Sequence, residues 1–355
     1  MTAFPVALAA AAEIVVSVAG PASGRQAARA QAILKGAREA ADAINAQSGI
    51  KGERLRVDFA DDACAATTAK ALAADLARKK VDLVLGHPCG SAGAAAAAVY
   101  GETGTLFIAT ASRHPPAGSR RAGATVFNLA GRDDRQGAEA AAFLADHYRG
   151  RAIAIVHDRT REQQELANAA TDALVRLGAA TPITAGLIGG DMDFPLLTAK
   201  IKAADAVFFA GYPLEAGMLY GQLRKAGSNP AFLMSASNGT IELINTFGDD
   251  VRGTFVMRPR FSLDGDDNAR DIDARLLAAD ETQAYAAVTA FAAAANLADS
   301  LNPENIAREL AARAYTTPHG SVHFNATGDS ERPSFDVFMW TGVKWERTGS
   351  GPLNH

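Results

Sequence analysis

The stretch Ile14-Val15-Val16-Ser17-Val18 is a short run of mostly β-branched residues, followed by Gly20-Pro21 and a long helical segment over 25–46. A strand, a turn and a helix in this order form the repeating unit of a parallel sheet. The pattern recurs, with strands expected at 55–59, 81–85 and 106–108 and helices at 67–79 and 91–100. Because parallel strands need crossover helices, the alternation predicts a doubly wound α/β sheet.

The alternation starts again at Ala152-Ile153-Ala154-Ile155-Val156, which ends in His157-Asp158. Beyond it we expect strands at 206–209, 232–234, 321–324 and 335–340, and helices at 161–177, 214–226, 282–299 and 303–314. Two βα series of similar size, with no long linker between them, predict two similar lobes joined by short crossings.

Length and composition exclude several classes of protein. A chain of 355 residues favours two domains. With 48% hydrophobic and 21% charged residues, the chain is not disordered. The net charge of −4, without a basic stripe, argues against a nucleic-acid partner. No apolar run reaches the roughly 18 to 20 residues of a bilayer-spanning helix, so we expect a soluble globular protein.

The N-terminus and the two cysteines bear on cellular location. Residues 1–12 form an apolar, alanine-rich stretch that is similar to the end of a secretory leader, although the basic start of a leader is missing. A leader remnant and a plain alanine tail both remain open. Cys64 and Cys89 are too few for a four-ligand zinc site, so they are either free core thiols or, in an exported protein, a disulfide.

Catalytic signatures are scarce in the sequence. The chain has no G-x-G-x-x-G after its first strand, no P-loop and no G-x-S-x-G motif. His319 and His323 have the i,i+4 spacing of a zinc-binding helix, but Gly320 and the expected strand argue against one. We therefore expect no metal, no cofactor and no catalytic residues, and a binding protein in preference to an enzyme.

Polar residues follow several of the expected strands at their carboxyl ends. In open α/β sheets, ligands bind at this edge, where helix N-termini offer unpaired N–H groups. A plain cap or turn is the alternative for each residue taken alone, whereas together they outline two rims. The candidates are Gly90, Ser91, Ala111, Ser112, Arg113, Tyr212, Ser237 and Asn238.

Seven short segments give the chain a resemblance to a known family. In the order of the chain they are 49–52 (GIKG), 61–64 (DDAC), 86–89 (GHPC), 131–137 (GRDDRQG), 153–158 (IAIVHD), 190–194 (GDMDF) and 211–217 (GYPLEAG). In this order and spacing they resemble the periplasmic leucine/isoleucine/valine-binding proteins of ABC transporters, collinearly from about Glu13 to Trp340. The resemblance implies two Rossmann-like lobes, three hinge crossings and one ligand clamped in the cleft between the lobes.

The family's chain course implies the domain bounds and the biological setting. Lobe one would comprise 13–130 plus 259–330, and lobe two 131–258 plus 331–347, with crossings near Gly131, Pro259 and Gly328. The resemblance also implies a Cys64–Cys89 disulfide, a periplasmic location and an ABC permease of the inner membrane as partner. We expect a monomer.

The chain departs from the family's pattern at several positions that bind the charged groups of the ligand in the family. Gly90 aligns with a serine that meets the ligand carboxylate, with Ser91 next to it. Arg113 aligns with a threonine that binds carboxylate and ammonium, and Arg29 aligns with an aromatic residue. Arginine suits a carboxylate, so we expect a more basic pocket than in the family's amino-acid binders, and a solvated rim is the alternative position for both arginines.

Another position at which the chain departs from the family binds the α-ammonium group of the ligand in the family. A glutamate that pairs with the ammonium aligns near Ser237, flanked by Asn238, and neither side chain can supply a negative charge. Tyr212 is retained, while Glu162 stands where the family has another tyrosine. A carboxylate without an ammonium, such as an aromatic or 2-oxo acid, is therefore the favoured ligand. Two alternatives remain: an amino-acid binder whose ammonium is held by Glu162, and a cytoplasmic ligand sensor with the same fold.

Overall fold

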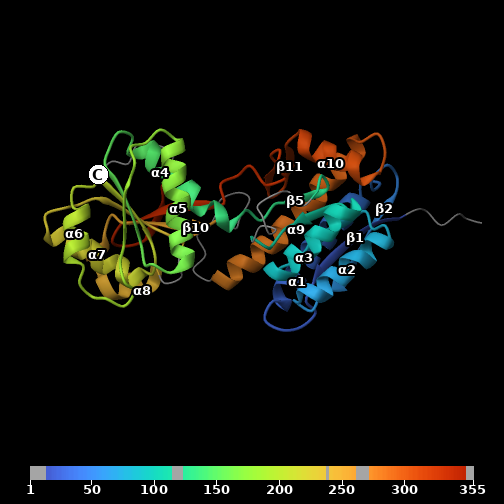
Figure 1. Ribbon diagram of the computed structural model, residues 1–355. Helices are drawn as coiled ribbons and strands as arrows, with labels where there is room; N and C mark the ends of the chain where they lie inside the picture. Colours follow the sequence, from blue (N-terminus) through green and yellow to red (C-terminus); the bar gives the residue numbers. More distant parts are fainter. Residues whose placement is uncertain (1–12, 114–122, 237–239, 261–271, 349–355) are drawn as a thin grey trace, which may run out of the picture. The chain divides into compact units, whose positions relative to one another are not determined.

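The computed structural model describes residues 13–113, 123–236, 240–260 and 272–348 (Figure 1). The chain divides into two compact units. Unit 1 comprises Met1–Gly131 and Phe261–Arg332, and unit 2 comprises Arg132–Arg260 and Pro333–His355. Among the described residues, no helix combines the length and apolar character that crossing a bilayer requires.

Unit 1 is built on a five-stranded sheet with the order β2-β1-β3-β4-β5. All four pairings between neighbouring strands are parallel. The chain therefore runs from β1 to β2 on one side and then crosses to β3 on the other, which places the reversal of strand order between β1 and β3. The strands are β1 (Glu13–Gly20), β2 (Arg54–Asp61), β3 (Leu83–Gly86), β4 (Phe107–Ala109) and β5 (Val126–Asn128).

Helices cover both faces of this sheet. Along β3, Leu83 and Leu85 belong to a core with α1, α9 and α10, whereas Val84 belongs to a separate core with α2 and α3. This alternation is the period of two that a strand buried on both faces shows. The helices are α1 (Ala27–Asn45), α2 (Ala66–Arg78), α3 (Gly90–Thr103), α9 (Ile272–Leu297) and α10 (Pro303–Ala312), and a small hairpin of β11 (Tyr315–Thr317) and β12 (Gly320–Val322) completes the unit.

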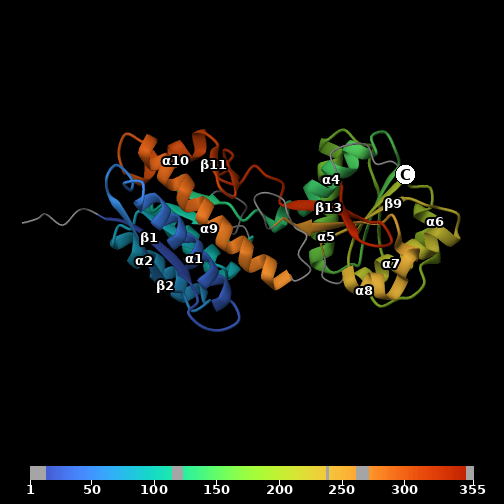
Figure 2. The same cartoon turned by 180° about the vertical axis from the view of Figure 1, so that it is seen from behind.

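Helices α1 and α9 lie side by side in unit 1 in both views (Figures 1 and 2). Gly36 of α1 faces the α9 backbone, and a Cβ built on Gly36 would lie 2.0 Å from the Glu281 carbonyl oxygen. Only glycine allows the two backbones to approach this closely. The contact brings residues far apart in sequence, on α1 and on the first half of α9, into register.

Unit 2 contains a seven-stranded sheet with the order β14-β13-β10-β9-β8-β6-β7. The strands from β10 to β7 are parallel, whereas β13 and β14 are antiparallel additions at one edge. The reversal of strand order lies between β6 and β8. The strands are β6 (Ile153–His157), β7 (Ile183–Gly186), β8 (Ala206–Ala210), β9 (Ala231–Met234), β10 (Phe255–Pro259), β13 (Phe335–Trp340) and β14 (Trp345–Arg347).

The second sheet is also covered on both faces. Ile153 and Ile155 of β6 pack with α4 and α5, whereas Ala154 and Val156 pack with α6 and α7. The helices of this unit are α4 (Gln136–His147), α5 (Arg161–Arg176), α6 (Pro195–Ile201), α7 (Pro213–Lys225) and α8 (Thr240–Phe247), with short 3-10 turns at Asp133–Arg135 and Gly248–Val251.

The architecture confirms the doubly wound α/β fold predicted from the alternation of strands and helices. The structure adds elements that the sequence did not reveal, among them β5, β7, β10 and α4. The chain passes from one unit to the other after Gly131, Arg260 and Arg332.

Candidate functional site

In unit 1 the predicted residues lie at the carboxyl end of the parallel sheet. Gly90 and Ser91 open helix α3, whose N-cap residue Cys89 makes no side-chain cap hydrogen bond. The N–H groups in the first turn of a helix have no partner within the helix, and the helix dipole makes this end favourable for anions. Ser91 is exposed to solvent. This end of α3 therefore offers a carboxylate several backbone donors.

The loop after β4 packs against the same turn of α3. Ser112 is 7% exposed. Its Cβ lies 3.6 Å from the position that a Cβ added to Gly93 of α3 would occupy. Its hydroxyl oxygen has no hydrogen-bond partner among the described residues. A buried hydroxyl without a partner is costly to a protein, so this group is available for an additional acceptor or donor.

Arg113 follows Ser112 and is 9% exposed. Its Nη1 donates a hydrogen bond of 2.8 Å to the carbonyl oxygen of Ala130, just after β5. The backbone thus orients this guanidinium, which takes part in further interactions as well.

Arg29, near the start of α1, forms a two-pronged ion pair within unit 1. Its Nε lies 2.6 Å from Asp280 Oδ2, and its Nη2 lies 2.8 Å from Asp280 Oδ1. Nη2 also donates to the Ala111 carbonyl oxygen at 3.0 Å. Burial raises the pKa of the Asp280 carboxyl, and the hydrogen bonds and charge of Arg29 act against that rise. The guanidinium predicted to meet a ligand is therefore already paired with a carboxylate.

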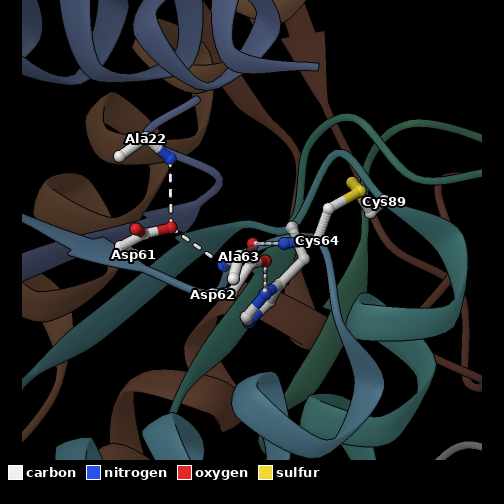
Figure 3. The surroundings of a disulfide bond; sticks show 7 residues. Ala22, Asp61, Asp62, Ala63, Cys64 and Cys89 are labelled. Atoms are coloured by element: carbon white, nitrogen blue, oxygen red, sulfur yellow. Dashed lines mark hydrogen bonds and ion pairs between the residues drawn. A yellow bond between two sulfur atoms is a disulfide. The ribbon is translucent and has the colours of Figure 1, made fainter. Parts of the chain in front are cut away.

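The disulfide anchors the start of α3 to the end of β2 (Figure 3). Cys64 and Cys89 are bonded, with their Cα atoms 5.5 Å apart, which confirms the predicted pairing. Asp62 Oδ1 accepts the Cys64 N–H at 2.8 Å, and Asp61 Oδ1 accepts the Ala63 N–H at 2.8 Å (Figure 3). Ala63 and Cys64 both have φ near +54°, at 53° and 55°. The two aspartates thus hold a turn that non-glycine residues rarely adopt.

A fully buried polar network extends from this turn into the core. His87 Nδ1 lies 2.7 Å from Asp62 Oδ2, and His87 Nε2 lies 3.2 Å from the Tyr100 hydroxyl. Burial, and next the charge of Asp62, raise the pKa of Tyr100 above its ordinary value. The network joins β2, β3 and α3, so it fixes the position of the α3 N-terminus together with the disulfide.

In unit 2 two predicted residues lie at helix starts. Glu162 is exposed in the first turn of α5, where the Thr160 side chain caps the helix by accepting the Gln163 N–H at 3.4 Å. Tyr212 is the N-cap residue of α7 and is 57% exposed. Ser237 and Asn238 lie outside the described residues.

The structure identifies Asp158 as a candidate that the sequence reasoning did not select. It follows β6, at the reversal of strand order in unit 2, and is 5% exposed. Oδ1 accepts hydrogen bonds from the Thr160 N–H at 2.9 Å and the Thr160 hydroxyl at 2.7 Å, whereas Oδ2 has no partner among the described residues. The signal was present in the sequence, because a carboxylate ends a buried strand.

The two histidines weighed as zinc ligands have other neighbours. The His319 ring contacts Tyr285 edge-on, with ring centroids 4.9 Å apart, and His323 Nδ1 lies 2.9 Å from Glu331. Within the described part of the chain, no cluster of three or more histidine, cysteine, aspartate or glutamate residues has the arrangement of a metal site.

Comparison with known proteins covers nearly the whole chain. Residues 13–342 match the periplasmic binding protein family. An amino acid binding protein of Pseudomonas aeruginosa is 33% identical over 339 residues, covering 93% of this chain and 90% of that protein. A structure from Rhodospirillum rubrum, described as a branched-chain amino acid ABC transporter, aligns with a TM-score of 0.73 at 20% identity over 95% of this chain and 100% of that chain. A solute-binding protein of R. palustris in complex with benzoate aligns with a TM-score of 0.56 at 16% identity over 96% and 97% of the two chains.

Proposed function

Because the chain belongs to the periplasmic binding protein family, we propose that it is the solute-binding protein of an ABC importer of the branched-chain amino acid type, with a small carboxylate as its ligand. Family members are solute-binding proteins and not enzymes. Aromatic and 2-oxo acids are the favoured ligands.

The observation that carries this proposal is the N-terminus of α3. Its first turn has no side-chain cap, and the buried, unpartnered hydroxyl of Ser112 lies against the same turn. A carboxylate placed there would receive backbone N–H groups and a hydroxyl, in the favourable field of the helix dipole. The disulfide and the His87 network hold this turn in place, which reduces the entropy lost on binding.

The absence of an acidic residue near position 237 supports a ligand without an ammonium group. Serine and asparagine stand at 237 and 238, and a desolvated ammonium needs a negative partner that neither can supply. The benzoate-bound neighbour is a carboxylate binder of the same fold, and its ligand has no ammonium.

Binding would involve both units. We propose that the ligand first meets the α3 edge of unit 1, and that Tyr212 and Glu162 of unit 2 then contact it. Contacts from both units at once would shift an open–closed equilibrium toward the closed state. The closed form would deliver the ligand to a permease in the inner membrane, and the disulfide suits a periplasmic location.

Matched pairs of ligands test the proposal directly. Leucine against 4-methyl-2-oxopentanoate, and phenylalanine against phenylpyruvate, differ only in the group on the α-carbon. We expect thermal-shift and calorimetric measurements to show tighter binding of the 2-oxo acid in each pair. Micromolar or tighter leucine binding, with the 2-oxo and aromatic acids inert, would refute the favoured ligand class.

A pair of variants tests the proposed carboxylate position. Ser112→Ala should weaken acid binding roughly 10- to 150-fold, because the hydroxyl would donate one hydrogen bond to an ionised carboxylate. Thr110→Val is the matched control, because it also removes a buried, unpartnered hydroxyl from the same loop. Equal losses in both variants would show a packing effect and contradict the assigned position.

An amino-acid ligand is the second candidate, and carboxylates at the edge of unit 2 favour it. Glu162 is exposed there, and Asp158 retains a carboxylate oxygen without a partner among the described residues. The Pseudomonas aeruginosa relative is named an amino acid binding protein. In this case Glu162→Gln should weaken the binding of leucine or phenylalanine but not the binding of the matched 2-oxo acid. If the affinity ratio within each pair is unchanged, Glu162 does not hold the ammonium.

A further inference from the structure

The ion pair between Arg29 and Asp280 lies at the carboxyl end of the unit 1 sheet, where we expect the ligand to bind. Arg29 reaches from the first turn of α1 to Asp280 on α9, and its Nη2 also donates to Ala111, the residue before Ser112. The guanidinium thus lies beside the loop that carries three of the candidate ligand-binding residues. Three bonds fix its orientation.

Arg29 and Asp280 differ in how far their side chains are exposed to solvent. The side chain of Asp280 is 3% exposed and that of Arg29 is 18% exposed, so the open face of the pair belongs to the arginine. A guanidinium has five N–H groups, of which Nε and Nη2 hold three. Within the described residues Nη1 donates no hydrogen bond, so its two N–H groups remain available.

Charge decides which ligand group suits this donor. Asp280 cancels the charge of Arg29, so the pair as a whole is neutral. A second carboxylate on a ligand would meet the Asp280 charge a few ångströms behind the guanidinium and lose most of the attraction. An oxo or hydroxyl oxygen needs no counter-charge and still accepts a hydrogen bond in a fixed direction.

We propose that the Arg29–Asp280 pair is a neutral, preoriented hydrogen-bond donor that selects monocarboxylates with an uncharged acceptor oxygen and discriminates against dicarboxylates. Arg29 touches the ligand, and Asp280 is a positioning residue that acts through Arg29. The proposal rests on the proposed carboxylate-binding function and assigns its ligand class more narrowly.

The test compares three probes by calorimetry: 4-methyl-2-oxopentanoate, 4-methylpentanoate without the oxo group, and 2-oxoglutarate with a second carboxylate. Wild-type protein should bind 4-methyl-2-oxopentanoate most tightly. Asp280→Asn frees the charge of Arg29, so we expect the affinity for 2-oxoglutarate relative to 4-methyl-2-oxopentanoate to rise roughly 10-fold or more. The double variant Arg29→Gln/Asp280→Asn removes both charges and should abolish both that gain and the advantage of the oxo group.

Glu281→Gln is the matched control for charge. Glu281 neighbours Asp280 on α9 and pairs with Lys35 of α1 at 2.8 Å, on a more exposed surface. Glu281→Gln changes the net charge by the same amount as Asp280→Asn, and it should leave the affinity ratios among the three probes unchanged. Circular dichroism establishes that each variant is folded before binding is compared.

The outcomes separate this inference from the proposed function. If wild-type protein binds the monocarboxylates but Asp280→Asn leaves the probe ratios unchanged, the inference alone is overturned. An equal shift in Glu281→Gln would also overturn it, because the effect would then come from net charge. If wild-type protein binds none of the three acids and binds amino acids instead, the proposed function fails and the inference falls with it.

Discussion

Removal of the Cys64–Cys89 disulfide should destabilise unit 1 by an amount that the chain connectivity predicts. The bond joins residues separated by 25 positions. For a loop of this length, the entropy that the cross-link removes from the unfolded chain corresponds to about 3.5 kcal/mol at 25 °C. In a unit of this size each kcal/mol shifts Tm by roughly 2–4 °C, so Cys64→Ala/Cys89→Ala should lower Tm by roughly 7–14 °C.

Differential scanning calorimetry with and without reductant measures this effect. Reductant should lower the Tm of wild-type protein toward that of the double variant and leave the variant itself unchanged. Because Cys89 is the N-cap of α3, the variant should also bind carboxylates more weakly. A Tm shift below about 2 °C, or two free thiols in the unreduced, denatured protein, would refute the reasoning.

Three other changes test separate parts of the structure. Arg113→Ala should weaken a carboxylate ligand roughly 10- to 150-fold in calorimetry, the effect of one charge-assisted hydrogen bond, and an unchanged Kd would remove Arg113 from the site. Gly36→Ala should cost roughly 1–3 kcal/mol in denaturant unfolding, because its Cβ would meet the Glu281 carbonyl oxygen. Gly221→Ala is its control, since among the described residues no atom beyond its own stretch of helix lies within 4 Å of the added Cβ, and it should be neutral or stabilising. Burial lowers the pKa of His157 from 6.5, so the unfolded chain takes up the proton first and stability falls as pH drops below about 6.5. The Tm advantage of wild type over His157→Gln should therefore shrink between pH 7.5 and 5.0, and a constant difference would contradict the prediction.

The sequence predicted the fold well where strands are apolar and buried. The strands around residues 14–18, 152–156 and 206–209 are short, largely apolar runs rich in Ile, Val or Phe, and each forms an interior strand of its sheet. Strand β7 was not predicted because it is a half-exposed edge strand of four residues. Strand β5 has only three residues, too few for a periodic pattern.

The sequence predicted those residues of the candidate site that lie directly after a strand, but not the contacts between residues far apart in the chain. Gly90, Ser91 and Ser112 follow strands, and strand ends in a parallel sheet meet at one edge. The partner of Arg29 could not be foreseen, because Asp280 lies 251 residues away and becomes its neighbour only through the close packing of α1 against α9. Sequence reasoning therefore assigned Arg29 a free charge, whereas the fold neutralises it.

The two arginines of unit 1 share a feature that bears on how a ligand would be recognised. Arg29 donates to the Ala111 carbonyl oxygen, and Arg113 donates to the Ala130 carbonyl oxygen. Side chains held in this way lose little conformational freedom when a ligand binds, so they can discriminate between ligands at low entropic cost. Tyr212 of unit 2 is 57% exposed, so packing restrains its side chain less, and contact with a ligand costs it more conformational entropy. We therefore expect substitutions in unit 1 to change which acids bind, and substitution of Tyr212 to weaken all of them by a similar factor.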